Sequence, residues 1–163
     1  MGAVPLRRPD GAVDLVAVAE TFDRAFVDEP ADRSDPQLFA LIEGATDDDA
    51  EIAHWPDVGH ELLMWEIVPP PNCLVLVLVT TGWAAPLDDD GECRTRPSRH
   101  PDRRRSHSVT AIGNEGEMVS VLRIAGEAPQ VLTGECYGRA PDALRRCWAR
   151  RTPADVACVH DWP

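Results

Sequence analysis

The chain has 163 residues, of which 44% are hydrophobic and 27% charged, and its net charge at pH 7 is −12. This length favours one compact domain with a core that needs neither disulfides nor metals to stabilise it. The acidic balance argues against general binding of nucleic acid, because the surface would repel phosphates. The longest apolar run, CLVLVLV (73–79), is too short to span a bilayer, so no membrane association is expected.

The N-terminal segment and the cysteines indicate a compartment. MGAVPLRRPDG has neither the apolar core nor the cleavage site of a signal peptide. Five cysteines without closely spaced pairs do not resemble a secreted disulfide framework. We therefore expect a cytoplasmic protein whose thiols are free and buried.

Charge is distributed unevenly. All 16 positive residues are Arg and none is Lys, as the codon bias of a GC-rich bacterium or its phage would produce. Residues 1–92 carry 20 acidic groups against four Arg (−16), residues 93–110 carry six Arg against one Asp (+5), and the remainder sums to −1. Residues 93–110 are therefore a basic segment within an acidic chain, and we call them the basic segment.

Helices are predicted first along the chain. Residues 10–27 place apolar side chains at helical spacing, with Asp10 or Asp14 near the start. Residues 34–44 suggest a second helix that ends at Gly44, followed by an acidic loop at 46–51. Residues 56–67 fit a helix capped by Asp57, although Leu62–Ile67 also suits a strand.

Strands are predicted in the second half. CLVLVLVTTGW (73–83) is apolar and β-branched, as in a strand buried on both faces. A polar loop at 85–102 follows, then a hairpin over 108–125 that turns at Asn114–Gly116, and a short strand at 130–133. Residues 139–151 predict a helix with an Arg-rich outer face.

These elements predict an α+β fold with N-terminal helices, an antiparallel β-meander of about three to five strands and a C-terminal helix. One domain would span 1–163, with a mainly helical part (1–67), a sheet (73–133), a helix (139–151) and a tail (153–163) that docks on the body through Trp162.

One part of the predicted sheet carries a sequence pattern that resembles a pattern in other proteins. TTGW (80–83) is followed by a variable acidic loop, and PSRHPDRRR (97–105) then leads into the hairpin. This pattern is similar to an uncharacterised family of actinobacterial hypothetical proteins over roughly residues 73–125. The resemblance implies no activity, but it implies that the loop and the hairpin form one structural unit.

The basic segment holds the candidate site residues. Anion or partner binding is assigned to Arg99, Arg103, Arg104, Arg105 and His107, and the weak catalytic candidates are His100 and Asp102. If a strand begins near Arg103, then Arg103, Arg105 and His107 share one face with Val109 and Ala111, while Arg104, Ser106 and Ser108 share the other. Some of these basic groups would therefore pair with the protein's own carboxylates.

Metal and cofactor sites are not expected. Cysteine and histidine fall into two loose sets, Cys93 with His100 and His107, and Cys147 with Cys158 and His160. Neither set contains the closely spaced ligand pairs of a zinc site.

Two functions remain open. The first is a non-enzymatic interaction or accessory protein that binds another protein through the 85–107 loop. The second is a phosphate-ester hydrolase or transferase, with His100 as base, Asp102 as its orienting group and Arg103–Arg105 as a clamp. Arginines paired with the protein's own carboxylates would favour the first, and arginines gathered around a pocket with His100 would favour the second.

Overall fold

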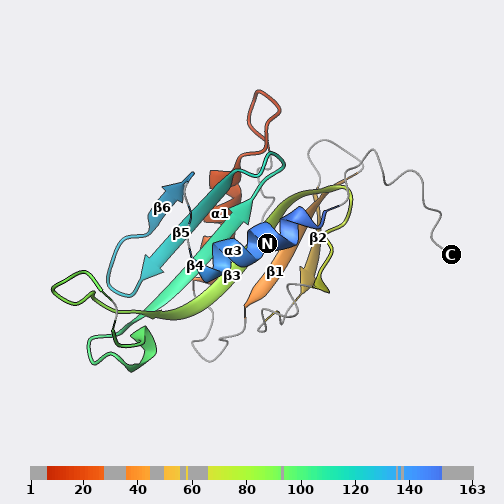
Figure 1. Cartoon of the computed structure of the whole chain (residues 1–163). Helices are drawn as coiled ribbons and strands as arrows, with labels where there is room; N and C mark the ends of the chain where they lie inside the picture. Colours follow the sequence, from red (N-terminus) through yellow and green to blue (C-terminus); the bar gives the residue numbers. More distant parts are fainter. Residues whose placement is uncertain are drawn as a thin grey trace.

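The computed structural model is an α+β structure that describes residues 7–27, 36–44, 50–55, 58, 66–92, 94–134, 136 and 138–151 (Figure 1). Within these residues a six-stranded antiparallel sheet has the order β2-β1-β3-β4-β5-β6. The strands are β1 (Gln37–Glu43), β2 (Ala50–Trp55), β3 (Cys73–Ala84), β4 (Arg104–Ile112), β5 (Met118–Ile124) and β6 (Gln130–Thr133). The helices are α1 (Leu15–Phe26) and α3 (Arg139–Ala149), with a short 3-10 helix, η1 (Pro97–Arg99).

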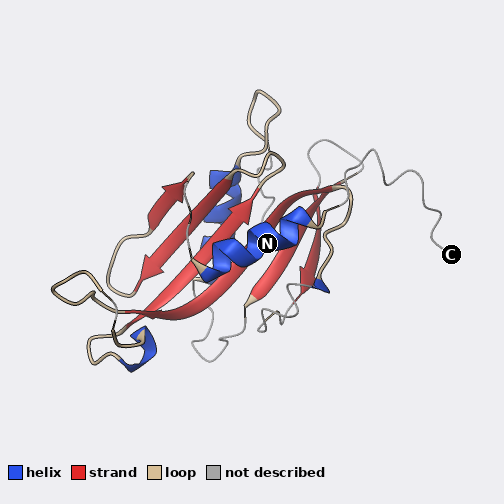
Figure 2. Ribbon diagram, in the orientation of Figure 1, coloured by secondary structure: helices blue, strands red, loops and turns tan. Residues whose placement is uncertain are grey.

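The sheet lies between the two helices, so the described part has three layers (Figure 2). We call the two sides of the sheet the α1 face and the α3 face. Apolar residues of α1 and of alternate strand positions form the core on the α1 face, around Phe22, Val77 and Val109. Leu144 and Cys147 of α3 pack on the α3 face against residues such as Leu76. No helix in the described ranges is long and apolar enough to cross a membrane.

The predicted central strand is confirmed as β3, the longest strand. Val75, Val77 and Val79 belong to the core on the α1 face. Leu76 and Leu78 belong to the core on the α3 face. Burial on both faces explains why this segment is continuously apolar.

The helix predicted over 34–44 is wrong, because this segment forms β1. Leu38 and Ala40 are buried on the α3 face, whereas Phe39 and Leu41 are buried on the α1 face. Four consecutive buried residues leave no polar stripe for a surface helix, but they suit a strand that lies between β2 and β3.

The acidic loop predicted at 46–51 is wrong in its last two residues, where β2 begins, and 45–49 lie outside the described residues. The sheet therefore has six strands rather than three to five. Of the helix predicted over 56–67, only positions 58, 66 and 67 are described. The tail that was predicted to dock on the body (153–163) also lies outside the described residues, which end at Arg151.

The other predicted elements are confirmed. Asp14 caps α1, where its carboxylate accepts a hydrogen bond from the Ala17 amide at 3.0 Å. The hairpin consists of β4 and β5, and Gly116 adopts φ +81° in its turn, a conformation that favours glycine. The short strand at 130–133 is β6, and the C-terminal helix is α3.

Candidate functional site

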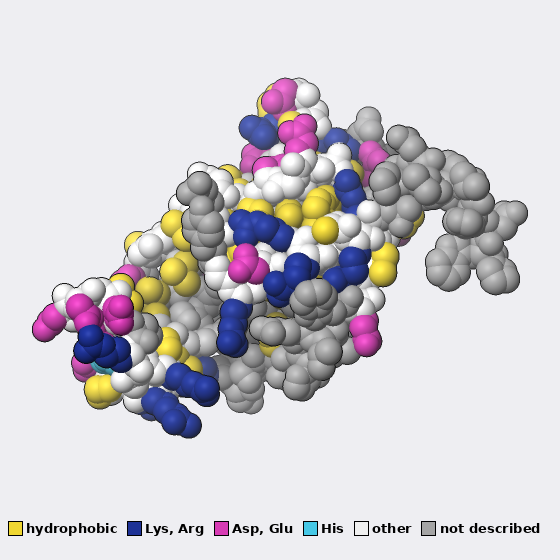
Figure 3. Space-filling model, in the orientation of Figure 1, with side chains coloured by type: hydrophobic (Ala, Val, Ile, Leu, Met, Phe, Trp, Pro, Cys, Tyr) yellow, Lys and Arg dark blue, Asp and Glu magenta, His cyan; other side chains and the backbone are white. Residues whose placement is uncertain are grey.

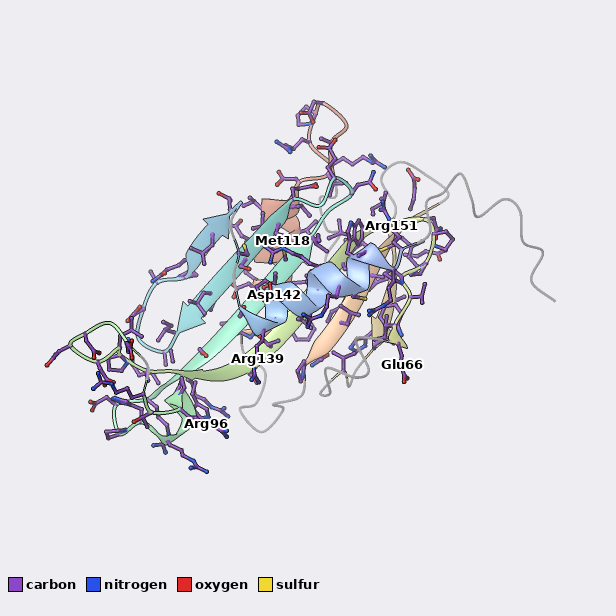
Figure 4. All side chains as sticks on the ribbon, in the orientation of Figure 1. Glu66, Arg96, Met118, Arg139, Asp142 and Arg151 are labelled. Atoms are coloured by element: carbon purple, nitrogen blue, oxygen red, sulfur yellow. The ribbon has the colours of Figure 1, made fainter. Side chains whose placement is uncertain are left out.

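Two strands extend past the end of α1 and carry the basic segment away from the body. β3 and β4 stay paired as far as Ala84 and Arg104, and the loop between them projects from one corner of the sheet (Figure 1). We call residues 83–105 the β3–β4 arm. The space-filling view shows arginines, the only dark-blue residues in a chain without Lys, clustered at this corner and along α3 (Figure 3). Figure 4 places Arg96 on the arm and Arg139 on α3.

The basic residues of β4 alternate between the two faces, as expected from strand periodicity. Val109 and Ala111 lie in the core on the α1 face, and His107, two residues earlier, approaches Asp23 of α1. Ile112 lies in the core on the α3 face, which fixes Arg104 on that side. The arginine run is therefore divided between two surfaces.

Trp83 organises the arginines of the α1 face. It pairs with Arg105 across the strands, and its side chain is 37% exposed. The guanidinium carbon of Arg105 lies 4.6 Å from the centroid of the indole ring, and that of Arg103 lies 5.1 Å from it. Both distances are within the range of cation–π contacts, so one tryptophan holds two arginines in defined positions.

Arg104 and Arg99 differ in their surroundings. The Arg104 guanidinium donates a hydrogen bond to the Glu127 carboxylate and contacts the carbonyl of Ala125, so it is paired within the protein. Arg99 ends η1 and is exposed, as is Arg96 just before it. Arg94 is exposed as well but pairs with Asp90. Among the described residues of the arm, Arg96, Arg99 and Arg103 are thus the exposed arginines for which no carboxylate partner is found.

The side chains of His100 and Asp102 lie next to acidic residues, while the Arg103 guanidinium donates a hydrogen bond to the His100 carbonyl at 3.3 Å. The Nδ1 atom of His100 accepts a hydrogen bond from the Asp102 amide at 3.1 Å, so the Asp102 carboxylate does not orient this nitrogen. Both residues line an open hollow of about 660 Å³ together with Asp88, Asp89 and Asp90. Its one guanidinium, from Arg94, pairs with Asp90. This arrangement would repel a phosphate ester.

His107 belongs to a buried cluster that the sequence analysis missed. The Asp23 side chain is 3% exposed and accepts hydrogen bonds from Arg123, from Nε at 2.8–2.9 Å and from Nη2 at 2.7 Å. The Nε2 atom of His107 lies 3.7 Å from the same carboxylate. Two signals could have found it: Arg123 lies two residues after Val121 in an apolar strand, and Asp23 directly follows Phe22 in α1.

The described residues contain no group of three or more His, Cys, Asp and Glu side chains that could hold a metal ion. Of the two loose sets named above, Cys93, Cys158 and His160 lie outside the described residues. Cys147 is buried in the core under α3, where its thiol contacts the carbonyl of Ile67.

Three described cysteines, Cys73, Cys136 and Cys147, are free and buried, and burial changes their chemistry. Loss of solvation raises the pKa of the Cys73 thiol from 9.0 to about 12, and it also raises the pKa of Cys147. These thiols therefore remain protonated near neutral pH and are poor nucleophiles and poor metal ligands.

Thiol labelling tests this burial. In a Cys93→Ser/Cys158→Ser background at pH 8, we expect the three remaining thiols to react with an aromatic disulfide reagent far more slowly in the folded protein than in urea. Because unfolding lowers the raised pKa values of Cys73 and Cys147, the free energy of unfolding should fall as the pH rises from about 9 toward 12. Equal labelling rates in the folded and unfolded protein would contradict the burial of these side chains.

Comparison of the chain with family models, with curated proteins and with solved structures finds no match.

Proposed function

We propose that this chain is a non-enzymatic interaction or accessory protein that binds another protein through the β3–β4 arm. The observation that carries the proposal is the exposed Trp83 with Arg103 stacked on its ring, on a projection held by strand pairing. Arg96 and Arg99 are exposed on the same arm. Tryptophan and arginine are the residues most often found at the energetic centre of protein interfaces. Leu87 is 62% exposed and adds apolar area on the same arm, where it lies next to Asp88–Asp90.

The stacking of Arg103 and Arg105 on Trp83 supports the proposal, because it orders these long side chains before a partner binds. An arginine that is already held against an indole ring loses less rotamer entropy when a partner arrives. Arg103 and Arg105 are both held in this way, and strand pairing positions the backbone beneath them. These two arginines of the arm are therefore preorganised for binding a partner.

Charge indicates the chemistry of the partner. The arm carries exposed arginines in a chain of net charge −12, so an acidic partner surface is attracted to the base of the arm and repelled by the acidic part of the chain. Asp88, Asp89 and Asp90 in the same loop limit how far along the arm an acidic surface can lie. We propose a partner that presents carboxylates next to an apolar group.

The alternative of a phosphate-ester hydrolase or transferase has less support. It requires His100 and Asp102 to share a pocket with Arg103–Arg105. His100 and Asp102 instead line the acidic hollow, Arg104 pairs with Glu127, and Arg103 and Arg105 stack on Trp83.

Affinity capture from the native lysate tests the proposal with two variants of equal charge. Arg99→Ala/Arg103→Ala removes two exposed arginines of the arm, whereas Arg24→Ala/Arg139→Ala removes exposed arginines from the two helices. We expect the arm variant to recover its specific partner at least about tenfold less efficiently, and the control to recover it as wild type does. Equal recovery by both variants, at equal stability in urea, would reject the arm as the binding surface.

A further inference from the structure

The strand β6 forms one edge of the six-stranded sheet (Figure 1). β5 pairs with its inner side, and no other strand of the described residues pairs with its outer side. All of its residues are exposed, and the exposed fractions of Val131 and Leu132 are 42% and 45%. An edge strand presents unpaired backbone groups, so it can pair with a strand of another chain.

The backbone groups on the outer side of β6 follow from the hydrogen bonds on its inner side. The Gly134 amide donates to the Met118 carbonyl at 3.2 Å, and the pairing of β5 with β6 continues from these two residues in the same register. In an antiparallel pair, every second residue directs its N–H and C=O groups to a given neighbour. Even-numbered residues of β6 therefore face β5, whereas the N–H and C=O groups of Val131 and Thr133 point to the outer side.

The two edges of the sheet differ in charge. No charged residue occurs between Glu127 and Glu135, although 27% of the chain is charged. The other edge strand, β2, carries the exposed Glu51. Charged side chains protect an edge strand from pairing with other chains. The β6 edge lacks this protection.

Apolar side chains lie on both faces of the β6 edge. Val131 pairs with Val121, which belongs to the core on the α1 face. Leu132 is the next residue of the strand, so its side chain lies on the α3 face. A strand added on the outer side of β6 would contact both of these exposed side chains.

From this geometry we infer that β6 pairs antiparallel with β6 of a second copy of this chain. A twofold axis at Leu132 places Val131 of each copy opposite Thr133 of the other. Every outward-facing N–H group of β6 then has a carbonyl partner, and the two Leu132 side chains meet on the α3 face. A register centred on Val131 would instead place Thr133 opposite Pro129, which has no N–H to donate.

The pairing is self-complementary, as a twofold interface between identical chains requires. It opposes no like charges, and salt screens the repulsion between the acidic remainders of the two copies. Because β6 has only four residues, the interface is smaller than the about 1,200–2,000 Å² of stable complexes, and we expect a dissociation constant on the order of 0.1–1 mM. β6 shares no residue with the β3–β4 arm, so this surface goes beyond the proposed protein interaction.

Sedimentation equilibrium of the purified chain tests the inference, between about 10 μM and about 1 mM so that the range spans the expected dissociation constant. We expect the average mass of the wild type to rise from that of a monomer toward that of a dimer. Leu132→Lys places like charges opposite each other at the axis and should remain monomeric. Ile52→Lys makes the same charge change at an exposed residue of β2 and should dimerise as wild type does. A monomeric wild type at the highest concentration, or loss of the dimer in Ile52→Lys, would overturn the inference.

Two further variants test the register. Leu132→Glu should be monomeric by itself, but its mixture with Leu132→Lys should associate at least about tenfold more tightly than either variant alone, because opposite charges meet at the axis. Val131→Pro removes an outward N–H without removing a bond to β5, so it should abolish the dimer and unfold in urea as a cooperative domain. A mixture that associates no better than its components, or a dimer that survives Val131→Pro, would contradict this pairing. None of these results depends on whether the β3–β4 arm binds a protein.

Discussion

Replacing Asp23 by alanine is expected to lower the free energy of unfolding by about 3–5 kcal/mol. The carboxylate is buried, accepts hydrogen bonds from Arg123 and lies next to His107. Its removal would leave the Arg123 guanidinium without its carboxylate partner beneath the end of α1, and a cation in that position is costly. Urea unfolding followed by circular dichroism measures the loss.

A double-mutant cycle distinguishes the interaction energy of the Asp23–Arg123 pair from the packing energy that each substitution also removes. Arg123→Met alone should also be strongly destabilising, because it leaves the Asp23 carboxylate buried without its guanidinium. Asp23→Leu/Arg123→Met should be far more stable than the two single changes predict when added together. Arg104→Ala, which breaks the exposed pair with Glu127, should cost less than about 1 kcal/mol. Additive effects of the two single changes would contradict the buried pair.

Replacing Phe22 by alanine is expected to destabilise the protein by about 3–5 kcal/mol. Its side chain is fully buried between α1 and the sheet, with its ring 5.0 Å from that of Phe39 and 6.3 Å from that of Phe26. Truncation removes buried apolar area and leaves a cavity that close-packed neighbours fill only in part. Urea unfolding gives the size of the effect.

Phe22→Leu is the control, because it keeps most of the buried apolar surface and should cost clearly less than the alanine change. Ala25 lies on the exposed side of the same helix, so Ala25→Ser should have little effect. A Phe22→Ala variant within about 1 kcal/mol of wild type would show that α1 does not pack on this face of the sheet.

Much of the fold follows from local patterns. A continuous apolar and β-branched run identified β3, and the Asn114–Gly116 turn identified the β4–β5 hairpin. Apolar spacing identified α3, and the same spacing with a capping Asp identified α1. These signals are local, since each depends on a few neighbouring residues. The β1 segment was misassigned because Pro36 and Gly44 resemble the residues at the two ends of a helix, whereas the four consecutive apolar residues Leu38–Leu41 between them suit a strand that is buried on both faces.

The site was only partly predictable. Alternation correctly divided Arg104 from Arg105 and His107, because register within a strand is a property of the sequence. Asp23 and Arg123 are 100 residues apart in the chain, and only the packing of α1 on β5 brings them together. The position of His100 at the acidic hollow likewise depends on the path of the loop, which no local periodicity specifies.

Site-specific photo-crosslinking tests the binding role of the arm most directly. A photoreactive residue at Leu87, on the arm, is compared with one at Val131, which is also exposed but lies on the edge strand β6. The proposal predicts that Leu87 yields a crosslink to one specific protein, that Arg99→Ala/Arg103→Ala abolishes this crosslink, and that Val131 yields no crosslink to this protein. Crosslinking of the same protein from Val131 and not from Leu87, or a Leu87 crosslink that survives loss of both arginines, would contradict it.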